Sequence, residues 1–455
     1  MNLNIVILAA GEGKRMYSST PKVLHKVGGK PMLQHVIDVA NKLNPNKLII
    51  VYGHKGEQVQ STINDAFKDN SFSWVYQDKQ LGTGHALKMA LPHLDSTGAT
   101  LVLYGDVPLI NYKTLTKMLD SYNENVVMLT AILNDTYGYG RILRDETGKI
   151  IKVVEEKDTT DKEKDIKEIN TGFYIFPNHL LPIWLNQLSN DNQQKEYYLT
   201  DVVELAHKSN KLIQNIATTT IYEIRGVNNK VQLEQVERIY QGILADTLLE
   251  KGVTLADKSR IDIRGDISVG QDCYIDVNCV FEGNITLGNN VIIGVGSVLK
   301  NVIISDGVCI KPYSIIEDAI LGADSIIGPF SRIRPGTTLA QNTHIGNFVE
   351  VKNSKIGIGS KVNHLTYVGD AEIGSGVNVG AGSVTCNYDG KNKFKTVIED
   401  GVFIGSGTMM VAPVTIKTGG VIGAGSTITK DTPENELTVS RAKQVTVLGW
   451  KKKQK

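Results

Sequence analysis

The first residues that could do chemistry follow the first apolar run of the chain, which ends at Leu8. Three small residues come next, Ala9–Gly11, and the cations Arg15 and Lys22 stand shortly after them. Small residues let backbone N–H groups approach phosphate oxygens closely, and fixed cations add positive charge. The string lacks both the third glycine of a dinucleotide fingerprint and the Gly-Lys-Ser/Thr of a P-loop. It therefore predicts a polyphosphate-binding loop of another kind.

A carboxylate follows a later apolar run. Residues 101–104 are Leu-Val-Leu-Tyr, and Gly105 and Asp106 come directly after them. In parallel sheets, ligands bind beyond the carboxyl ends of the strands, where this carboxylate and the phosphate loop can meet. The alternative is a structural role, in which Asp106 caps a turn and Glu155 pairs with Lys157.

In the second half of the chain, His364 has polar and cationic neighbours in Arg334, Lys352, Tyr367 and Asn378. An imidazole with its ordinary pKa of about 6.5 can take a proton from an attacking amine near neutral pH. A lone histidine is more often structural, so a catalytic role depends on these neighbours converging in space.

Strands and helices alternate through the first half. The runs 5–8, 48–51 and 101–104 are continuously apolar, as in strands buried on both faces. From Pro31 onward apolar residues recur at helical spacing, and 84–94 also reads as a helix. This alternation predicts a Rossmann-like α/β domain whose mostly parallel sheet is covered on both faces.

The second half repeats with a period of six residues. Aliphatic side chains recur at this spacing, and glycine often follows them. Three such runs are Leu287, Ile293 and Leu299; Ile327, Ile333, Leu339, Ile345 and Val351; and Ile404, Met410, Ile416, Ile422 and Ile428. One buried aliphatic per six residues predicts a parallel β-helix. The polar insertion Asn387–Lys395 interrupts the repeat and predicts a loop on one face.

Between the halves, residues 231–250 read as one connecting helix. Its apolar stripe is Leu233, Val236, Tyr240, Ile243 and Thr247. Two heptads are too few for a coiled coil, so we expect the stripe to pack on a domain. The expected organisation is a domain at 1–230, a linker helix at 231–251 and a β-helix domain with a C-terminal tail at 252–455.

The composition argues against several classes of protein. The 49 basic and 48 acidic residues give a net charge of +1, which argues against a nucleic-acid or anionic-membrane surface. The four cysteines lack CxxC spacing, so neither a zinc site nor a disulfide framework is expected. No apolar run approaches the ~20 residues of a membrane span, and the N-terminus does not read as a signal peptide. We expect a cytoplasmic protein with small-molecule substrates, no nucleic-acid partner and no membrane insertion.

The phosphate loop, with its Pro21-Lys22 pair, resembles that of the sugar-1-phosphate nucleotidyltransferases. With the hexapeptide half attached, essentially the whole chain resembles a bifunctional family of bacterial cell-envelope precursor synthesis. That resemblance implies acetyl transfer from acetyl-CoA to glucosamine-1-phosphate in the second half. It implies uridylyl transfer from UTP to N-acetylglucosamine-1-phosphate in the first half, which gives UDP-N-acetylglucosamine and pyrophosphate.

The resemblance also implies roles for residues of the first site. Arg15 and Lys22 would be catalytic residues on the phosphates, and Asp106 and Asn228 would hold Mg²⁺. One carboxylate and one amide oxygen suit this ion, because it keeps waters and takes substrate phosphates. The sugar phosphate is itself the nucleophile, so the protein's task is positioning and charge neutralisation. The implied UDP-sugar contacts are Leu8, Ala9, Ala10, Gly11, Lys22, Gln77, Gly82, Thr83, Tyr104, Gly105, Asp106, Gly140, Glu155, Asn170 and Asn228.

For the second site, the resemblance implies that His364 is the general base that frees the amine of glucosamine-1-phosphate. The implied sugar-phosphate contacts are Arg334, Lys352, Tyr367 and Asn378, and the acetyl-CoA contacts are Ala381, Asn387, Tyr388, Ser406, Ala424 and Arg441. Asn363 stands where many relatives have glycine, and asparagine tolerates a left-handed backbone better than other non-glycine residues. The family's β-helix is left-handed and trimeric, with acetyl-transfer sites at subunit boundaries, so a homotrimer is expected.

Two other functions remain open. A monofunctional sugar-1-phosphate nucleotidyltransferase would carry a structural or regulatory β-helix, although a purely structural prism needs neither His364 nor the Asn387–Lys395 loop. A non-catalytic scaffold would keep the nucleotidyltransferase fold for binding, although Arg15, Lys22 and Asp106 oppose this. The Asp106→Ala variant discriminates among these functions, because two independent sites predict loss of UDP-sugar formation with acetyl transfer intact.

Overall fold

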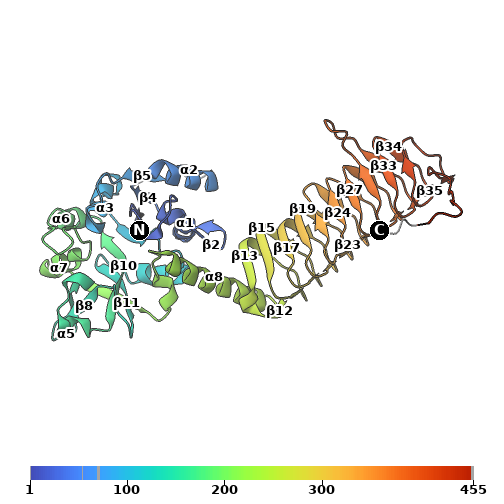
Figure 1. The fold of residues 1–455 in the computed structure, drawn as a ribbon. Coiled ribbons are helices and arrows are strands. Elements are labelled where there is room, and N and C mark those ends of the chain that lie inside the picture. The colour runs from blue at the N-terminus through green and yellow to red at the C-terminus, as the bar shows by residue number, and fades with distance from the viewer. Residues whose placement is uncertain (1, 54, 69–71, 452–455) are drawn as a thin grey trace. The chain divides into compact units, whose positions relative to one another are not determined.

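The protein is described by a computed structural model that covers residues 2–53, 55–68 and 72–451 (Figure 1). The chain divides into two compact units, Met1–Tyr240 and Gln241–Lys455. The helix α8 (Lys230–Glu250) crosses this division, so its two parts are described with the units to which they belong. No helix in the described part of the chain is long and apolar enough to cross a membrane.

A sheet of nine described strands forms the centre of the first unit. In spatial order its main strands are β11 (Ile213–Thr218), β7 (Val126–Ile132), β10 (Glu168–Pro177), β6 (Ala99–Tyr104), β1 (Leu3–Ala9), β4 (Lys47–Tyr52) and β5 (Ser73–Tyr76). β8 (Arg141–Arg144) and β9 (Ile150–Val154) branch from β10. β10 runs antiparallel to β6 and β7, whereas β1 is parallel to β4 and β6. The predicted mostly parallel α/β sheet is therefore confirmed.

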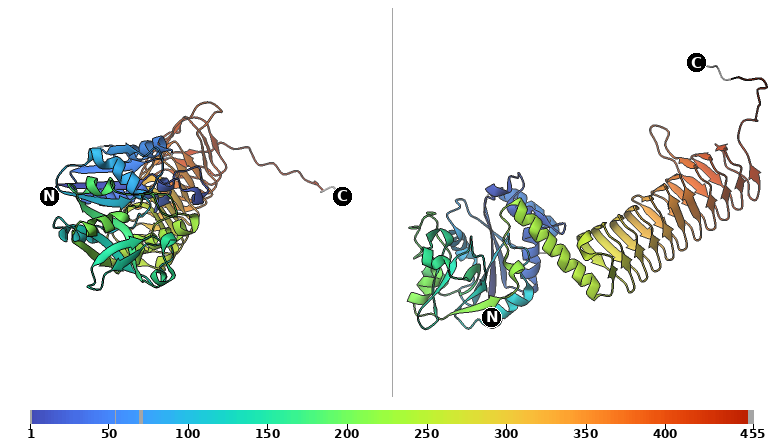
Figure 2. Two further views of the ribbon diagram at one scale, coloured as in Figure 1. Left: turned by 90° about the vertical axis from the view of Figure 1, so that its left-hand side faces the viewer. Right: turned by 60° about the horizontal axis from the view of Figure 1, so that its bottom comes forward.

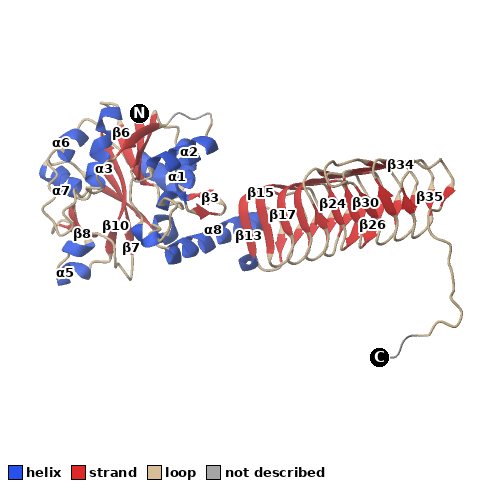
Figure 3. Ribbon diagram, turned by 45° about the horizontal axis from the view of Figure 1, so that its top comes forward, coloured by secondary structure: helices blue, strands red, loops and turns tan. Residues whose placement is uncertain are grey.

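Helices cover both faces of this sheet (Figure 3). Ile5 and Ile7 of β1 pack with one set of helices, and Val6 and Leu8 with the other, because successive strand residues point to opposite faces. The first set is α1 (Met32–Lys42), α2 (Gly56–Ala66) and α4 (Tyr112–Asp120), and the second is α3 (Thr83–Ala90), α6 (Leu181–Leu185) and α7 (Asp201–Lys208). Strands enclosed in this way must be apolar throughout, as their sequences are.

Short elements fill the connections of the first unit. They are η1 (Lys14–Met16), η2 (Lys22–Leu24), β2 (Lys26–Val27), β3 (Lys30–Pro31), η3 (Leu91–His93), η4 (Glu156–Asp158), α5 (Asp161–Lys164) and η5 (Ile221–Ile224). The strands β2 and β3 pair antiparallel as a small hairpin directly after η2. Two of these elements carry predicted cations, since Arg15 lies in η1 and Lys22 in η2.

The apolar stripe predicted for α8 holds only in part. In the first unit Leu233, Val236 and Tyr240 belong to a hydrophobic cluster, as predicted. In the second unit Ala245 and Leu248 are the buried apolar residues of the helix. Thr247 is exposed and donates a hydrogen bond to the carbonyl oxygen of Ile243, 2.9 Å away. The stripe changes position because the two parts of the helix pack against different cores.

The second unit is a near-closed parallel β-helix, and Figure 2 shows its stacked coils. Ile261 pairs with Cys279, 18 residues later, and Val298 pairs with Ile315, 17 residues later. Each coil therefore contains three hexapeptides, and the predicted six-residue repeat is confirmed. At the insertion, Val384 pairs with Met409 instead, so this coil includes the Asn387–Lys395 loop without losing the pairing of its strands.

The strands of the β-helix form two sheets in the described residues. One contains β12 (Thr254–Leu255), β14 (Tyr274–Ile275), β16 (Ile292–Ile293), β18 (Cys309–Ile310), β20 (Ile326–Ile327), β23 (His344–Asn347), β26 (Lys361–His364), β29 (Asn378–Val379), β32 (Phe403–Ile404), β35 (Val421–Ile422) and β37 (Leu437–Thr438). The other contains β13 (Ile261–Ser268), β15 (Cys279–Leu287), β17 (Val298–Ile304), β19 (Ile315–Leu321), β21 (Arg332–Ile333), β22 (Thr337–Leu339), β24 (Glu350–Lys352), β25 (Lys355–Ile356), β27 (Tyr367–Gly369), β28 (Ala371–Ile373), β30 (Val384–Cys386), β31 (Thr396–Ile398), β33 (Met409–Val411), β34 (Val414–Ile416) and β36 (Thr427–Ile428). The short helix η6 (Lys258–Arg260) precedes β13.

Candidate functional sites

A cleft of about 600 Å³ opens where β1 and β6 end. The lining includes many of the predicted residues, namely Leu8, Ala9, Ala10, Gly11, Lys22, Gln77, Gly82, Thr83, Tyr104 and Asp106. Glu12, Lys14, Val23, Gln80, Ala86 and Glu196 also line the cleft and were not predicted. The phosphate loop and the carboxylate meet here because they follow neighbouring parallel strands.

Lys22 joins the two residues expected to hold a metal. Its ammonium, only 12% exposed in side-chain terms, forms an ion pair with Asp106 and donates a hydrogen bond to Oδ1 of Asn228, 3.1 Å away. The backbone N–H of Val227 donates to the carbonyl oxygen of Asp106 at 3.0 Å, which holds the two segments together. A carboxylate and an amide oxygen thus share one cation. The oxygen donors and the negative charge fit Mg²⁺.

One wall of the cleft runs from Gln77 to Thr83. The buried Gln77 donates from Nε2 to the carbonyl oxygen of Gly82 at 3.3 Å, and the same atom lies 2.9 Å from Nδ1 of His85. Gly82 has φ +107°, and a Cβ there would lie 2.6 Å from the carbonyl oxygen of Tyr197. Glycine is therefore required at this position, and the next residue, Thr83, begins α3.

The three residues expected to contact the acetamido sugar also converge. The backbone N–H of Asn170 donates to the carbonyl oxygen of Gly140 at 2.8 Å, and a Cβ at Gly140 would lie 3.6 Å from Oε2 of Glu155. Oδ1 of Asn170 accepts from the Tyr174 hydroxyl at 2.8 Å, and Oε1 of Glu155 accepts from the Thr200 hydroxyl at 2.9 Å. Burial raises the pKa of the Glu155 carboxyl. The group presents oxygen acceptors that suit sugar hydroxyls.

Tyr104 lies between the sugar residues and the metal-binding pair. Burial raises the pKa of Tyr104, and the carboxylates of Glu155 and Asp106 raise it further. The N–H of Gly105 donates to the carbonyl oxygen of Leu8 at 2.9 Å, which ties the two strand ends together. Arg15, in contrast, is exposed on η1 and is not among the lining residues. The structure therefore brings the predicted first-site residues together except for Arg15.

An acidic residue that the sequence did not single out lies beside Glu155. Asp201 is the first residue of α7 and directly follows Thr200. Burial raises the pKa of Asp201 to about 6, with further contributions from the carboxylates of Glu155, Glu204 and Asp158. The sugar end of the site is therefore electrostatically negative, whereas the phosphate end carries Lys22.

In the second unit, a line of backbone contacts connects His364 with the small residues expected to bind acetyl-CoA. His364 ends β26, and its carbonyl oxygen accepts from Gly382 at 3.2 Å. The carbonyl oxygens of Ala381 and Ser406 accept from the N–H groups of Gly407 and Gly425, each at 2.8 Å. The line ends where Nη1 of Arg441 donates to the carbonyl oxygen of Ala424 at 2.7 Å.

The residues expected to hold the sugar phosphate lie on neighbouring strands. Nη1 of Arg334 forms an ion pair with Oε1 of Glu350 at 2.7 Å, and this hydrogen bond raises the pKa of Arg334. Glu350 pairs in register with Tyr367, and Lys352 lies on the same strand, β24. Asn378, on β29, pairs with Lys361, which begins the strand that His364 ends.

The insertion loop adds a cation that the sequence did not single out. Lys393 lies within hydrogen-bonding reach of Lys352, which lowers the pKa of Lys393, while Asp370 opposes part of this effect. Two facing ammonium groups suit a phosphate dianion. Of the two predicted loop residues, Asn387 is buried and donates from Nδ2 to Asp370, whereas Tyr388 is 60% exposed and donates to the carbonyl oxygen of Gly390 at 2.6 Å.

The left-handed backbone considered at Asn363 is not present there. Asn363 does not occur among the described non-glycine residues with positive φ, whereas Leu365, directly after the histidine, has φ +50°. The close contact is instead at Gly346, where a Cβ would lie 2.1 Å from the carbonyl oxygen of Asn363. Oδ1 of Asn363 is buried with no hydrogen-bond partner in the described structure. Asparagine at this position therefore requires no unusual backbone beside His364.

Comparison with protein families matches three segments of the chain. Residues 5–146 match the MobA-like NTP transferase domain, 263–356 the GMPPB C-terminal domain, and 395–430 the bacterial transferase hexapeptide (six repeats). The four described cysteines are free, and the described residues contain no group of three or more His, Cys, Asp or Glu that could hold a metal ion.

Similar proteins align along the whole chain. It is 59% identical over 454 residues to the bifunctional protein GlmU of Chromobacterium violaceum, with 100% of this chain and 99% of the relative covered. It is 52% identical over 452 residues to the bifunctional protein GlmU of Nitrosospira multiformis, with 99% and 97% covered. A crystal structure of a UDP-glucose pyrophosphorylase complexed with UDP-glucose is 17% identical and covers 53% of this chain and 98% of that one. Its TM-score of 0.43 is too low to establish a shared fold.

Proposed function

The chain belongs to the family of bifunctional GlmU proteins, and from this premise we propose that it catalyses two successive reactions. The β-helix domain, 252–455, transfers the acetyl group of acetyl-CoA to the amine of glucosamine-1-phosphate. The first domain, 1–230, transfers the uridylyl group of UTP to the resulting N-acetylglucosamine-1-phosphate, and releases pyrophosphate. Residues 231–251 are the linker between them. The product, UDP-N-acetylglucosamine, is a precursor of the cell envelope.

In uridylyl transfer, the phosphate oxygen of the sugar attacks the α-phosphorus of UTP, and pyrophosphate leaves. The N–H groups of Ala9–Gly11, with Lys22 and Arg15, bind the triphosphate. Gln77 and Gly82 bind the uracil ring, while Gly140, Glu155 and Asn170 orient the sugar. Asp106 and Asn228 hold Mg²⁺, which neutralises charge on the phosphates when bound. The cation that these two oxygens already share, Lys22, supports this assignment.

In acetyl transfer, Nε2 or Nδ1 of His364 accepts a proton from the amine of glucosamine-1-phosphate as the nitrogen attacks the thioester carbonyl. The thiolate of CoA is the leaving group and takes a proton in turn. Arg334, Lys352, Tyr367 and Asn378 bind the sugar phosphate, and Lys393 adds a further cation. Acetyl-CoA contacts Ala381, Asn387, Tyr388, Ser406 and Ala424, and a CoA phosphate binds Arg441.

The observation that carries the proposal is the backbone line from His364 to Arg441. A β-helix with a purely structural role needs no base at one end of a row of small side chains and no arginine at the other. We further propose that the protein is a cytoplasmic homotrimer with a left-handed β-helix, and that its acetyl-transfer sites lie at subunit boundaries.

Two variants of the full chain test the proposal. Thiol release from acetyl-CoA is measured with glucosamine-1-phosphate and no UTP, and pyrophosphate release is measured with UTP and N-acetylglucosamine-1-phosphate. We expect His364→Ala to lose the first activity and keep the second, and Asp106→Ala to do the reverse. A folded wild-type protein without thiol release would instead be a monofunctional nucleotidyltransferase with a structural or regulatory β-helix.

A further inference from the structure

The part of α8 that belongs to the first unit contacts the segments on both sides of the cleft's cation. This part, 230–240, follows Asn228 directly and packs against the hairpin β2–β3, which follows Lys22. None of its residues lines the cleft. Its influence on the site must therefore act through the residues that it holds.

The first of these contacts is at Asn228. Oε1 of Gln232 accepts a hydrogen bond from the backbone N–H of Asn228 at 2.7 Å. The N–H of Gln232 in turn donates to Oδ1 of Asn229 at 2.9 Å, so the two residues cap the beginning of the helix reciprocally. Asn228 presents its own Oδ1 to Lys22 from this fixed backbone. The orientation of the amide oxygen in the site is thus tied to the first turn of α8.

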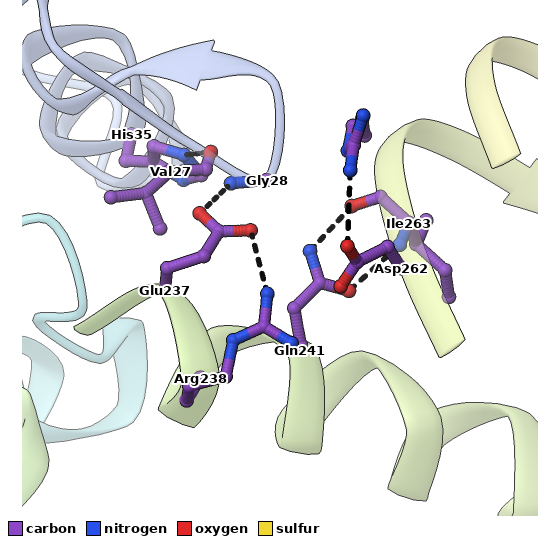
Figure 4. A network of polar contacts seen from close by, with 9 residues as sticks. Val27, Gly28, His35, Glu237, Arg238, Gln241, Asp262 and Ile263 are labelled. Carbon is purple, nitrogen blue, oxygen red and sulfur yellow. Dashed lines mark hydrogen bonds and ion pairs between the residues drawn. The ribbon is translucent and has the colours of Figure 1, made fainter. Parts of the chain in front are cut away.

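The second contact is at the hairpin, and Figure 4 shows it at Gly28. Oε2 of Glu237 accepts the N–H of Gly28 at 2.7 Å. The ring of Tyr240 packs so closely on Gly28 that a Cβ there would lie 2.2 Å from it. The same ring meets His35 edge to face, with centroids 4.9 Å apart. The imidazole of His35 donates to the carbonyl oxygen of Val27 at 2.8 Å, which locks the hairpin from its other side.

The third contact is apolar and leads to the phosphate loop. Val236 is buried with Met16, Val27 and Val227 in one cluster. Met16 follows Arg15, and Val227 precedes Asn228. One helix face therefore packs against residues adjacent to two of the predicted site residues and against the hairpin that follows Lys22.

We propose that Gln232 and Glu237 are positioning residues for uridylyl transfer, which set the separation between the Lys22 ammonium and the Asn228 amide oxygen. This inference rests on the proposed uridylyl transfer in the first unit. Gln232 acts on the orientation of Asn228, and Glu237 acts on Lys22 through the hairpin. Neither residue touches a substrate.

The same helix provides a matched control in Gln241, which belongs to the second unit. Its Nε2 donates to the carbonyl oxygen of Ile263 at 2.8 Å, and its Oε1 accepts the N–H of Ile263 at 2.7 Å (Figure 4). Gln241→Ala therefore removes a buried side-chain-to-backbone contact from α8, as Gln232→Ala does, without changing any residue that supports Asn228 or Lys22.

The experiment compares Gln232→Ala, Gln232→Glu, Glu237→Ala and Gln241→Ala in the full chain. Pyrophosphate release gives kcat and KM, and calorimetry gives the affinity for UTP with and without Mg²⁺. Loss of a residue that orients a ligand to a metal typically lowers affinity or activity 10–100-fold. We expect Gln232→Ala to lower kcat about tenfold and to reduce the gain in UTP affinity from Mg²⁺ by a similar factor. The KM for N-acetylglucosamine-1-phosphate should stay within twofold.

The carboxylate of Gln232→Glu still accepts the Asn228 N–H, so this variant should recover most of both losses. Glu237→Ala should lower kcat with acetyl transfer unchanged, and Gln241→Ala should leave uridylyl transfer within twofold of wild type. Wild-type values in Gln232→Ala, equal losses in Gln241→Ala, or no recovery in Gln232→Glu would each overturn the inference. An inactive, folded wild type would instead overturn the proposed function itself.

Discussion

Asp201 should make the first unit less stable at neutral pH than it would be with a neutral side chain. The pKa of this carboxyl rises from an ordinary 3.8 to about 6, because burial and three nearby carboxylates disfavour its charged form. At full burial such a rise corresponds to about 3 kcal/mol. Asp201 is only partly buried, and it starts a helix, whose N-terminus favours negative charge. We therefore expect Asp201→Asn to stabilise the first unit by about 1.5 kcal/mol at pH 7.5.

The sign of this effect depends on pH in a defined way. A carboxyl with a raised pKa in the folded state stabilises that state fully below its ordinary pKa, and this contribution is lost as the pH rises through the folded-state pKa. For Asp201 the loss falls between about pH 3.8 and about pH 6. The variant should therefore match wild type at pH 4 and exceed it at pH 7.5, with a melting temperature about 4 °C higher.

Thermal unfolding followed by tryptophan fluorescence measures this difference, because Trp184 is buried in the first unit. The control is Glu57→Gln, which removes an exposed acid from the first turn of α2. It should be neutral or slightly destabilising at pH 7.5. Equal stabilisation by Asp201→Asn at both pH values, or destabilisation at pH 7.5, would refute the reasoning.

Three further variants test individual side chains. Lys393→Met should raise the KM for glucosamine-1-phosphate about tenfold, because a cation facing the phosphate is lost, and steady-state thiol release measures it. Arg441→Ala should raise the KM for acetyl-CoA and leave kcat unchanged; the effect should vanish with dephospho-CoA as donor if this arginine binds the 3′-phosphate. Gly82→Ala should lower uridylyl transfer at least tenfold with acetyl transfer intact, because its Cβ would lie 2.6 Å from the Tyr197 carbonyl oxygen; pyrophosphate release measures the loss.

The parts of the fold that could be predicted from the sequence are those with a strong period. The six-residue repeat directly reflects one inward side chain per short strand, so Leu287, Ile293 and Leu299 are buried as expected. The apolar runs at 5–8 and 101–104 likewise correspond to β1 and β6. The antiparallel strand β10 could not be predicted in the same way, since strand direction depends on pairing across the sheet rather than on local pattern.

The candidate sites divide along a similar line. Lys22 and Asp106 could be predicted because each follows a strand at the same edge of the sheet, and the structure pairs them. Lys393 was not singled out because its role depends on a loop that brings it to Lys352, a strand on another coil. Gln232 and Glu237 carry no local signal at all. Their contacts are with backbone N–H groups, which every sequence contains.

The coils of the β-helix have a mechanical consequence. Each strand pairs only with the coils before and after it, so force applied to the end of the chain would break one pairing layer at a time. A coil of 17 or 18 residues would add about 60 Å of extended chain per event. The coil with the insertion loop, which separates Val384 from Met409, would add about 85 Å. In a force–extension trace, the active-site loop would mark its own position as the one longer step.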